Sequence, residues 1–141
     1  MKILIAVDDS PGSLAALDAL LSRRAWFAAT PEYALVNVHL PLPFKGAAAR
    51  AGKGAVASYY DEEASAALAP AAERMARLGL GCATFKCVGD PAAEIVRQAG
   101  EWGADLIVLG THGYGNVATL LLGSVAQKVL ALAPLPVLLL R

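Results

Sequence analysis

Short apolar segments alternate with helical patterns along the chain, and this alternation constrains the fold more than any other feature. Five apolar runs predict strands, at residues 2–8, 33–39, 82–88, 105–109 and 136–140. Between them, apolar residues recur at helical spacing, as at Leu14, Leu17 and Leu21, which predicts four helices. Alternating strands and helices build a parallel sheet that is covered on both faces. The sequence therefore predicts a doubly wound, Rossmann-like α/β fold with five parallel strands in the order 3-2-1-4-5.

Start and stop signals place the ends of the predicted helices. Ser10-Pro11 and Asp90-Pro91 each combine a capping side chain with a proline suited to the first helical turn. Gly79 is expected to end a helix whose apolar face is formed by Ala64, Leu68, Ala71, Met75 and Leu78. Residues 40–57 contain two prolines and three glycines, which predicts a long loop.

Composition limits the classes of protein to which the chain can belong. A length of 141 residues predicts a single domain over residues 1–141, and 57% hydrophobic residues suit a sheet buried on both faces. Because 12 basic and 12 acidic side chains cancel, we expect neither nucleic acid nor a membrane surface as a partner. Without an apolar run of about 18 residues, no membrane-spanning helix is expected, and the predicted location is the cytoplasm.

The cysteines and histidines do not predict a metal site. Cys82 and Cys87 fall on opposite faces of a predicted strand, so no disulfide is expected between them. His39 and His112 do not complete a zinc spacing with these cysteines. We therefore expect no metal held by protein side chains alone.

Two loops stand out as candidates for a binding site. One is Asp8-Asp9-Ser10 after the first strand, and the other runs from Gly110 to Ser124 after the fourth strand. In the predicted strand order these loops are neighbours at the carboxyl end of the sheet, where open parallel sheets bind ligands. The sequence therefore predicts one crevice between them.

The second loop has the chemistry of a phosphate site. Gly110 and Gly113 are followed after nine residues by Gly123-Ser124-Val125 at a helix start. Glycines let backbone N–H groups approach phosphate oxygens, and the first N–H groups of a helix lack internal partners. Ser124 adds a hydroxyl donor. Together these neutral donors could hold a triphosphate without the lysine of a P-loop.

This pattern of glycines and serine resembles the ATP-binding branch of the universal stress protein family. Gly110, Gly113, Gly123 and Ser124 match its four positions, and the resemblance extends over nearly the whole chain. Further segments that fit the family are residues 6–10, 88–91, 104–110 and 136–138. One departure is Asn37, which stands where many members have a histidine.

The resemblance implies an ATP-binding module of the stress response rather than a dedicated enzyme, with no catalytic residue assigned. It implies that Gly110, Gly113, Gly123 and Ser124 hold phosphates, that Asp8 lies near the ribose or a phosphate-bound metal, and that the backbone around Val38 borders the adenine. Magnesium would arrive with the nucleotide. The family's pairing through the last strand implies a homodimer through residues 136–140, whose apolar edge would otherwise be exposed.

Two other functions remain open at this point. The same site could hydrolyse ATP slowly or transfer a phosphoryl group, with Asp8, Asp9 and His112 as candidates, although capping explains Asp9 and no acidic residue orients His112. A phospho-receiver is the second alternative, but the third strand ends without an aspartate and the fifth without a lysine.

Two weaker motifs are attributed to composition. Lys53 lies in a near miss for a P-loop, with one residue too many and no following Ser or Thr. Residues 113–118 fit the loose dinucleotide fingerprint, but they begin several residues after the strand.

Overall fold

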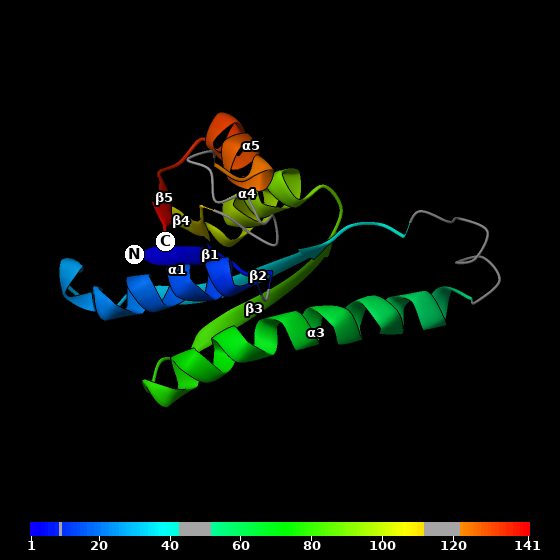
Figure 1. Cartoon of the computed structure of the whole chain (residues 1–141), viewed down its shortest axis with the longest axis horizontal. Helices are drawn as coiled ribbons and strands as arrows, with labels where there is room; N and C mark the ends of the chain where they lie inside the picture. Colours follow the sequence, from blue (N-terminus) through cyan, green and yellow to red (C-terminus); the bar gives the residue numbers. More distant parts are fainter. Residues whose placement is uncertain (9, 43–51, 112–121) are drawn as a thin grey trace.

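Five parallel strands form one sheet in the order β3-β2-β1-β4-β5, which confirms the predicted topology (Figure 1). This computed structural model describes residues 1–8, 10–42, 52–111 and 122–141. In the central register, Ile5 of β1 lies opposite Leu35 of β2 on one side and Val108 of β4 on the other. The strands are β1 (Lys2–Ala6), β2 (Glu32–His39), β3 (Cys82–Val88), β4 (Leu106–Gly110) and β5 (Val137–Leu140).

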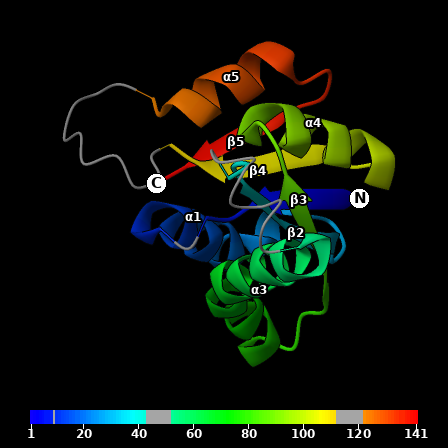
Figure 2. The ribbon, with the colours of Figure 1, turned by 90° about the vertical axis from the view of Figure 1, so that its right-hand side faces the viewer.

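Helices cover both faces of the sheet. Figure 2 shows α4 and α5 on one side of the strands and α1 and α3 on the other. In the described part of the chain the α-helices are α1 (Pro11–Ser22), α3 (Lys53–Arg77), α4 (Pro91–Trp102) and α5 (Ser124–Leu132). A short 3-10 helix, η1 (Arg24–Trp26), follows α1 and is not predicted from the sequence.

Strand alternation divides the core into two layers. In β1, Ile3 and Ile5 pack with the α1 and α3 side, whereas Leu4 packs with the α4 and α5 side. Helical residues at matching spacing complete each layer, for example Leu17 and Met75 on the first side and Ile95 and Val129 on the second. Apolar layers therefore cover both faces of the central strands, as the apolar runs predict, whereas the edge strand β3 is largely exposed.

The predicted caps are formed. Ser10 Oγ accepts a hydrogen bond from Ser13 N at 3.1 Å, and Asp90 Oδ1 accepts one from Ala93 N at 3.1 Å. Gly103 ends α4 with a φ of 72°, a left-handed conformation that favours glycine. The two cysteines are free, and Cys82 and Cys87 pack in different core layers, as expected from their spacing.

The start of α3 corrects the predicted loop over residues 40–57. The helix begins at Lys53, directly after Gly52, whose φ is 83°. A single glycine in a helix costs only about 1 kcal/mol relative to alanine, so Gly54 does not stop the alanine-rich run that follows it. The first turns of α3 extend beyond the sheet (Figure 1). There, Tyr60 Oη accepts a hydrogen bond from Leu42 N at 2.7 Å.

Among the described residues, no helix has the length and apolar character needed to cross a lipid bilayer.

Candidate functional site

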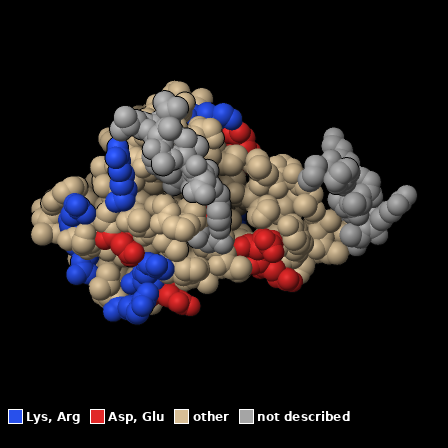
Figure 3. Space-filling view, viewed as in Figure 1, with Lys and Arg blue, Asp and Glu red and all other residues tan. Residues whose placement is uncertain are grey.

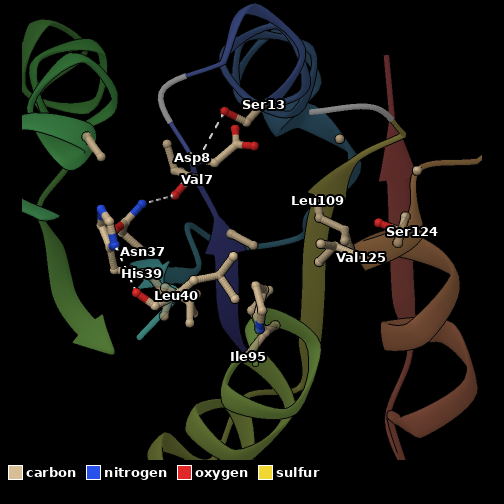
Figure 4. Close-up of a pocket in the computed structure, with 18 of the residues that line it drawn as sticks. Val7, Asp8, Ser13, Asn37, His39, Leu40, Ile95, Leu109, Ser124 and Val125 are labelled. Atoms are coloured by element: carbon tan, nitrogen blue, oxygen red, sulfur yellow. Dashed lines mark hydrogen bonds between the residues drawn. The ribbon is translucent and has the colours of Figure 1, made fainter. Parts of the chain in front are cut away.

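A cleft of about 900 Å³ opens at the carboxyl ends of β1, β2 and β4. Its walls come from the loop after β1, the last residues of β2, the end of β4 and the first turn of α5, and parts of α3 and α4 complete it (Figure 4). Its position is the one predicted from the order of the strands, because neighbouring loops meet at this edge of a parallel sheet.

A network of short polar side chains fixes the loop after β1. Asp8 Oδ1 accepts hydrogen bonds from Ser10 Oγ at 2.5 Å and from Ser10 N at 3.2 Å. Ser13 Oγ donates to Ser10 O at 3.1 Å and lies 3.4 Å from Asp8 N, from which it accepts. Only one oxygen of Asp8 is engaged in these bonds, and the residue is exposed at the cleft. The network therefore holds a carboxylate in a defined orientation with its second oxygen available.

The end of β4 and the start of α5 are held together at the base of the glycine loop. Thr111 N donates to Leu140 O at 3.0 Å, and Gly123 N donates to Thr111 O at 2.8 Å. Because Thr111 bonds to both segments, Gly110 and Gly123 face the same cleft although 13 positions separate them in the sequence.

The first turn of α5 lines the cleft with amides that lack an acceptor inside the helix. The first hydrogen bond inside this helix runs from Gln127 N to Gly123 O, at 3.0 Å, so the N–H groups of Ser124, Val125 and Ala126 have no acceptor within the helix. Gly123 supplies no capping side chain. These amides and the positive end of the helix dipole favour an anion at this place.

The conformation of Gly123 shows what its missing side chain provides. Its φ of −58° and ψ of 150° are open to any residue, so conformational freedom does not explain the glycine. Gly123 lines the cleft without a side chain, and a residue without a Cβ permits the close approach that a phosphate group needs.

The opposite end of the cleft is built from β2 and α3. Val38, His39 and Leu40 line it together with Glu63 of α3. His39 Nε2 lies 3.9 Å from Glu63 Oε2, and the imidazole ring packs against the rings of Tyr59 and Tyr60 at centroid distances of 6.0 and 5.7 Å. This end therefore combines apolar side chains and aromatic rings with a carboxylate, a lining that suits a planar ring.

Asn37 places a buried polar group in the wall of the cleft. Only 5% of the residue is exposed, and Asn37 Nδ2 donates to Val7 O at 2.8 Å. This bond fixes which end of the side-chain amide is the oxygen, because an oxygen in the same place could not donate. Within the described part of the chain Asn37 Oδ1 has no hydrogen-bond partner. A buried acceptor therefore remains free of the described residues in the wall of the cleft.

Charge in the cleft is slightly negative. Among the described lining residues, Asp8 and Glu63 are acidic and none is Lys or Arg. An anionic ligand would therefore be held by backbone amides and hydroxyls, and a divalent cation would reduce repulsion from Asp8. In the described ranges no group of three or more His, Cys, Asp or Glu side chains could bind a metal ion without the ligand.

Comparison with known proteins identifies the family. The model of the universal stress protein family matches residues 1–141. The chain belongs to the universal stress protein family. A curated relative, Universal stress protein MJ0531 of Methanocaldococcus jannaschii, is 35% identical over 140 residues, which cover 99% of this chain and 81% of the relative.

Solved universal stress proteins share the fold. The structure of hypothetical protein MJ0577 superposes with a TM-score of 0.82 at 27% identity, covering 99% of this chain and 94% of the other. A universal stress protein in complex with cAMP superposes with a TM-score of 0.69 at 26% identity, covering 100% and 96% of the two chains.

Most of the predicted site residues of this universal stress protein lie in the one cleft. Asp8, Val38, Gly110, Gly123, Ser124 and Val125 all line it. Val125 also packs partly against the core on the α4 and α5 side. Gly113 lies outside the described residues, as do Asp9 and His112, so their predicted roles remain predictions.

Sequence reasoning missed Asn37, His39 and Glu63 as parts of the site. A signal for Asn37 is present, because it is the polar residue at an inward position near the carboxyl end of an otherwise apolar strand. Glu63 had no comparable signal: an acidic residue on an exposed stretch of helix is ordinary, and only the packing of α3 beside β2 brings it to the cleft.

Proposed function

We propose that this universal stress protein binds ATP in the cleft and acts as a nucleotide-dependent regulatory module. The observation that carries the proposal is the first turn of α5, where amides without an acceptor in the helix, Ser124 and Gly123 line the same cleft as Gly110. The phosphates would lie here, against neutral donors. The solved universal stress protein that binds cAMP, at 26% identity, supports an adenine nucleotide as the ligand class.

The remaining parts of the cleft suit the rest of the nucleotide. The adenine would lie at the end formed by Val38, Leu40 and His39, where its ring meets apolar and planar groups. Ribose hydroxyls are donors, and the free oxygens of Asp8 and Asn37 are acceptors between the two ends. Magnesium bound to the phosphates would screen them from the Asp8 carboxylate and place the metal within its reach.

Isothermal titration calorimetry with ATP tests the proposal, in the presence and absence of magnesium. We expect one ATP per chain and tighter binding with magnesium than without it. In Asp8→Asn, which keeps the size of the side chain and an oxygen that can accept the hydrogen bonds from Ser10 but removes the charge, the magnesium enhancement should shrink. Binding that is indifferent to magnesium in both proteins would contradict the role proposed for Asp8.

Binding alone is sufficient for the proposed role, and turnover is not part of it. A regulatory module responds to the nucleotide through a change in conformation or in partner affinity, which requires only that the bound and free states differ in free energy.

We further propose that two copies of the chain pair through β5. This strand lies at the edge of the sheet, and its four residues are all half-buried and apolar. Ile107 N and Thr111 N donate to Pro136 O and Leu140 O. By strand alternation, the N–H of Leu139 points away from β4 and is available to a second copy.

A proline at position 139 tests this pairing selectively. Leu139→Pro removes an outward N–H while leaving the hydrogen bonds between β4 and β5 in place, and Leu139→Ala is the matched control that keeps the N–H. Sedimentation velocity should show a dimer for the wild type and for Leu139→Ala, and a monomer for Leu139→Pro. A monomeric wild type would refute the proposed dimer.

A further inference from the structure

We propose that the chain has a second ligand site, at the amino end of β2, which binds a small organic carboxylate. A cavity of about 330 Å³ lies there, between the segment that follows α1 and the turn that follows α3. Both of these segments lie at the left of Figure 1, at the opposite end of the strands from the nucleotide cleft. The site is thus separate from the nucleotide cleft, and its existence does not depend on ATP binding.

Tyr33 gives the first reason for a ligand in this cavity. The residue lines the cavity, is only 3% exposed, and its hydroxyl has no hydrogen-bond partner among the described residues. A buried hydroxyl without a partner costs about 1–3 kcal/mol, so native proteins rarely keep one without a reason. A bound acceptor would satisfy the group.

Arg24 gives the second reason. Among the described lining residues it is the one charged residue; it lies exposed at the surface, and its guanidinium makes no ion pair or hydrogen bond with the described part of the chain. Burial raises the pKa of the Tyr33 hydroxyl, and the charge of Arg24 lowers it to a smaller extent. Thr30 adds an exposed hydroxyl to the lining. Polar groups of Arg24 and Thr30 therefore line the cavity beside the buried hydroxyl of Tyr33.

The shape and charge of the cavity determine the class of ligand. A guanidinium binds a carboxylate through two parallel hydrogen bonds, and no lining residue is acidic. Phe27, Pro31 and Leu80 contribute apolar groups to the walls beside Arg24 and Thr30, so the cavity suits an anion that also carries a small hydrocarbon body. Figure 3 shows Lys and Arg atoms at this end of the molecule, with Asp and Glu atoms among them.

Benzoate is a suitable probe, because it combines a carboxylate with a small apolar ring. Titration followed by amide chemical shifts should give saturable changes at Thr30, Tyr33 and Leu80, and none at Ser124. Benzamide, which has the same shape without the charge, should bind at least about tenfold more weakly. Inorganic phosphate should also bind more weakly, because it lacks the apolar body; if phosphate binds as well as benzoate, the assigned ligand class is wrong.

Two variants show whether Arg24 and Tyr33 bind the ligand or only stabilise the fold. Arg24→Gln should weaken benzoate binding at least about tenfold, while the matched Arg23→Gln should not, because Arg23 lies outside the cavity and packs over Trp26. Tyr33→Phe removes a hydroxyl that has no hydrogen-bond partner among the described residues. Without ligand, this variant should therefore unfold at the wild-type temperature or higher. Benzoate should raise its unfolding temperature by less than it raises that of the wild type. The proposal is overturned if benzoate leaves these amides unchanged at millimolar concentration, or if Arg24→Gln and Arg23→Gln bind it equally.

Discussion

Replacing Ser124 by proline removes phosphate donors from α5 without disturbing the helix. Ser124 is the first helical residue, a position where proline is favoured because its N–H has no intrahelical acceptor. The chain already uses proline at this position in α1, at Pro11, and in α4, at Pro91. Proline also requires an extended residue before it, and Gly123, with a ψ of 150°, already has that conformation.

The expected loss can be worked out from the donors that disappear. Ser124→Ala removes the hydroxyl alone, whereas Ser124→Pro removes both the hydroxyl and the amide N–H. A hydrogen bond to a charged group contributes about 1.5–3 kcal/mol. Since 1.4 kcal/mol is about tenfold in affinity, Ser124→Ala should bind MgATP about tenfold more weakly, and Ser124→Pro at least about a hundredfold more weakly.

Calorimetry and thermal unfolding together decide the outcome. Without ligand, all three proteins should unfold at nearly the same temperature, and only their affinities for MgATP should differ. If Ser124→Pro binds as tightly as Ser124→Ala, the amide of residue 124 does not touch a phosphate. If both variants bind like the wild type, the first turn of α5 is not the phosphate site.

Three further predictions address the fold and the wall of the cleft. Asn37→Leu removes the acceptor Oδ1 and should weaken MgATP binding, measured by calorimetry, about threefold to tenfold. An unchanged affinity would exclude a contact between the nucleotide and Asn37 Oδ1. Gly103→Ala should lower the free energy of unfolding, measured in urea, by about 1–2 kcal/mol, because Gly103 has a φ of 72°. Gly100→Ala, inside α4, should raise the free energy of unfolding, because alanine favours the helix. Equal effects of the two substitutions would contradict the assigned conformations. Hydrogen bonds from the Ala93 N–H and Lys128 hold the pKa of Asp90 below its ordinary value of 3.8. The Asp90 carboxylate therefore stabilises the fold above pH 3.8, and this stabilisation is lost as the pH falls through the lower pKa of the folded state. Urea unfolding should therefore show Asp90→Ala as less stable than the wild type at neutral pH, with the gap narrowing in acid; a constant gap would contradict this explanation.

The order of the strands and the faces of the helices could be predicted because each depends on local pattern. β-branched and apolar runs identify the strands, and the caps at Ser10 and Asp90 place two helix starts at the correct residue. Parallel strands joined by helices permit few topologies, so the order of the sheet follows with little further information. The position of the cleft then follows from that order.

Features that depend on contacts between distant segments could not be predicted. The start of α3 at Lys53 depends on an alanine-rich run overcoming one glycine, a balance of about 1 kcal/mol that local pattern does not resolve. Glu63 reaches the cleft only because α3 packs beside β2. The oxygen of Asn37 and the hydroxyl of Tyr33 lack hydrogen-bond partners among the described residues. The sequence does not show which groups lie around a side chain, so a missing hydrogen-bond partner cannot be predicted from it.

The most direct test of the nucleotide proposal is to follow the backbone amides of Gly110, Ser124 and Val125 by NMR while MgATP is added. The account predicts that these signals move together and saturate at one equivalent of bound nucleotide, with smaller changes at Val38 and none at Leu80. If the three amides do not move with MgATP at millimolar concentration, the first turn of α5 does not bind phosphate and the proposed function is wrong.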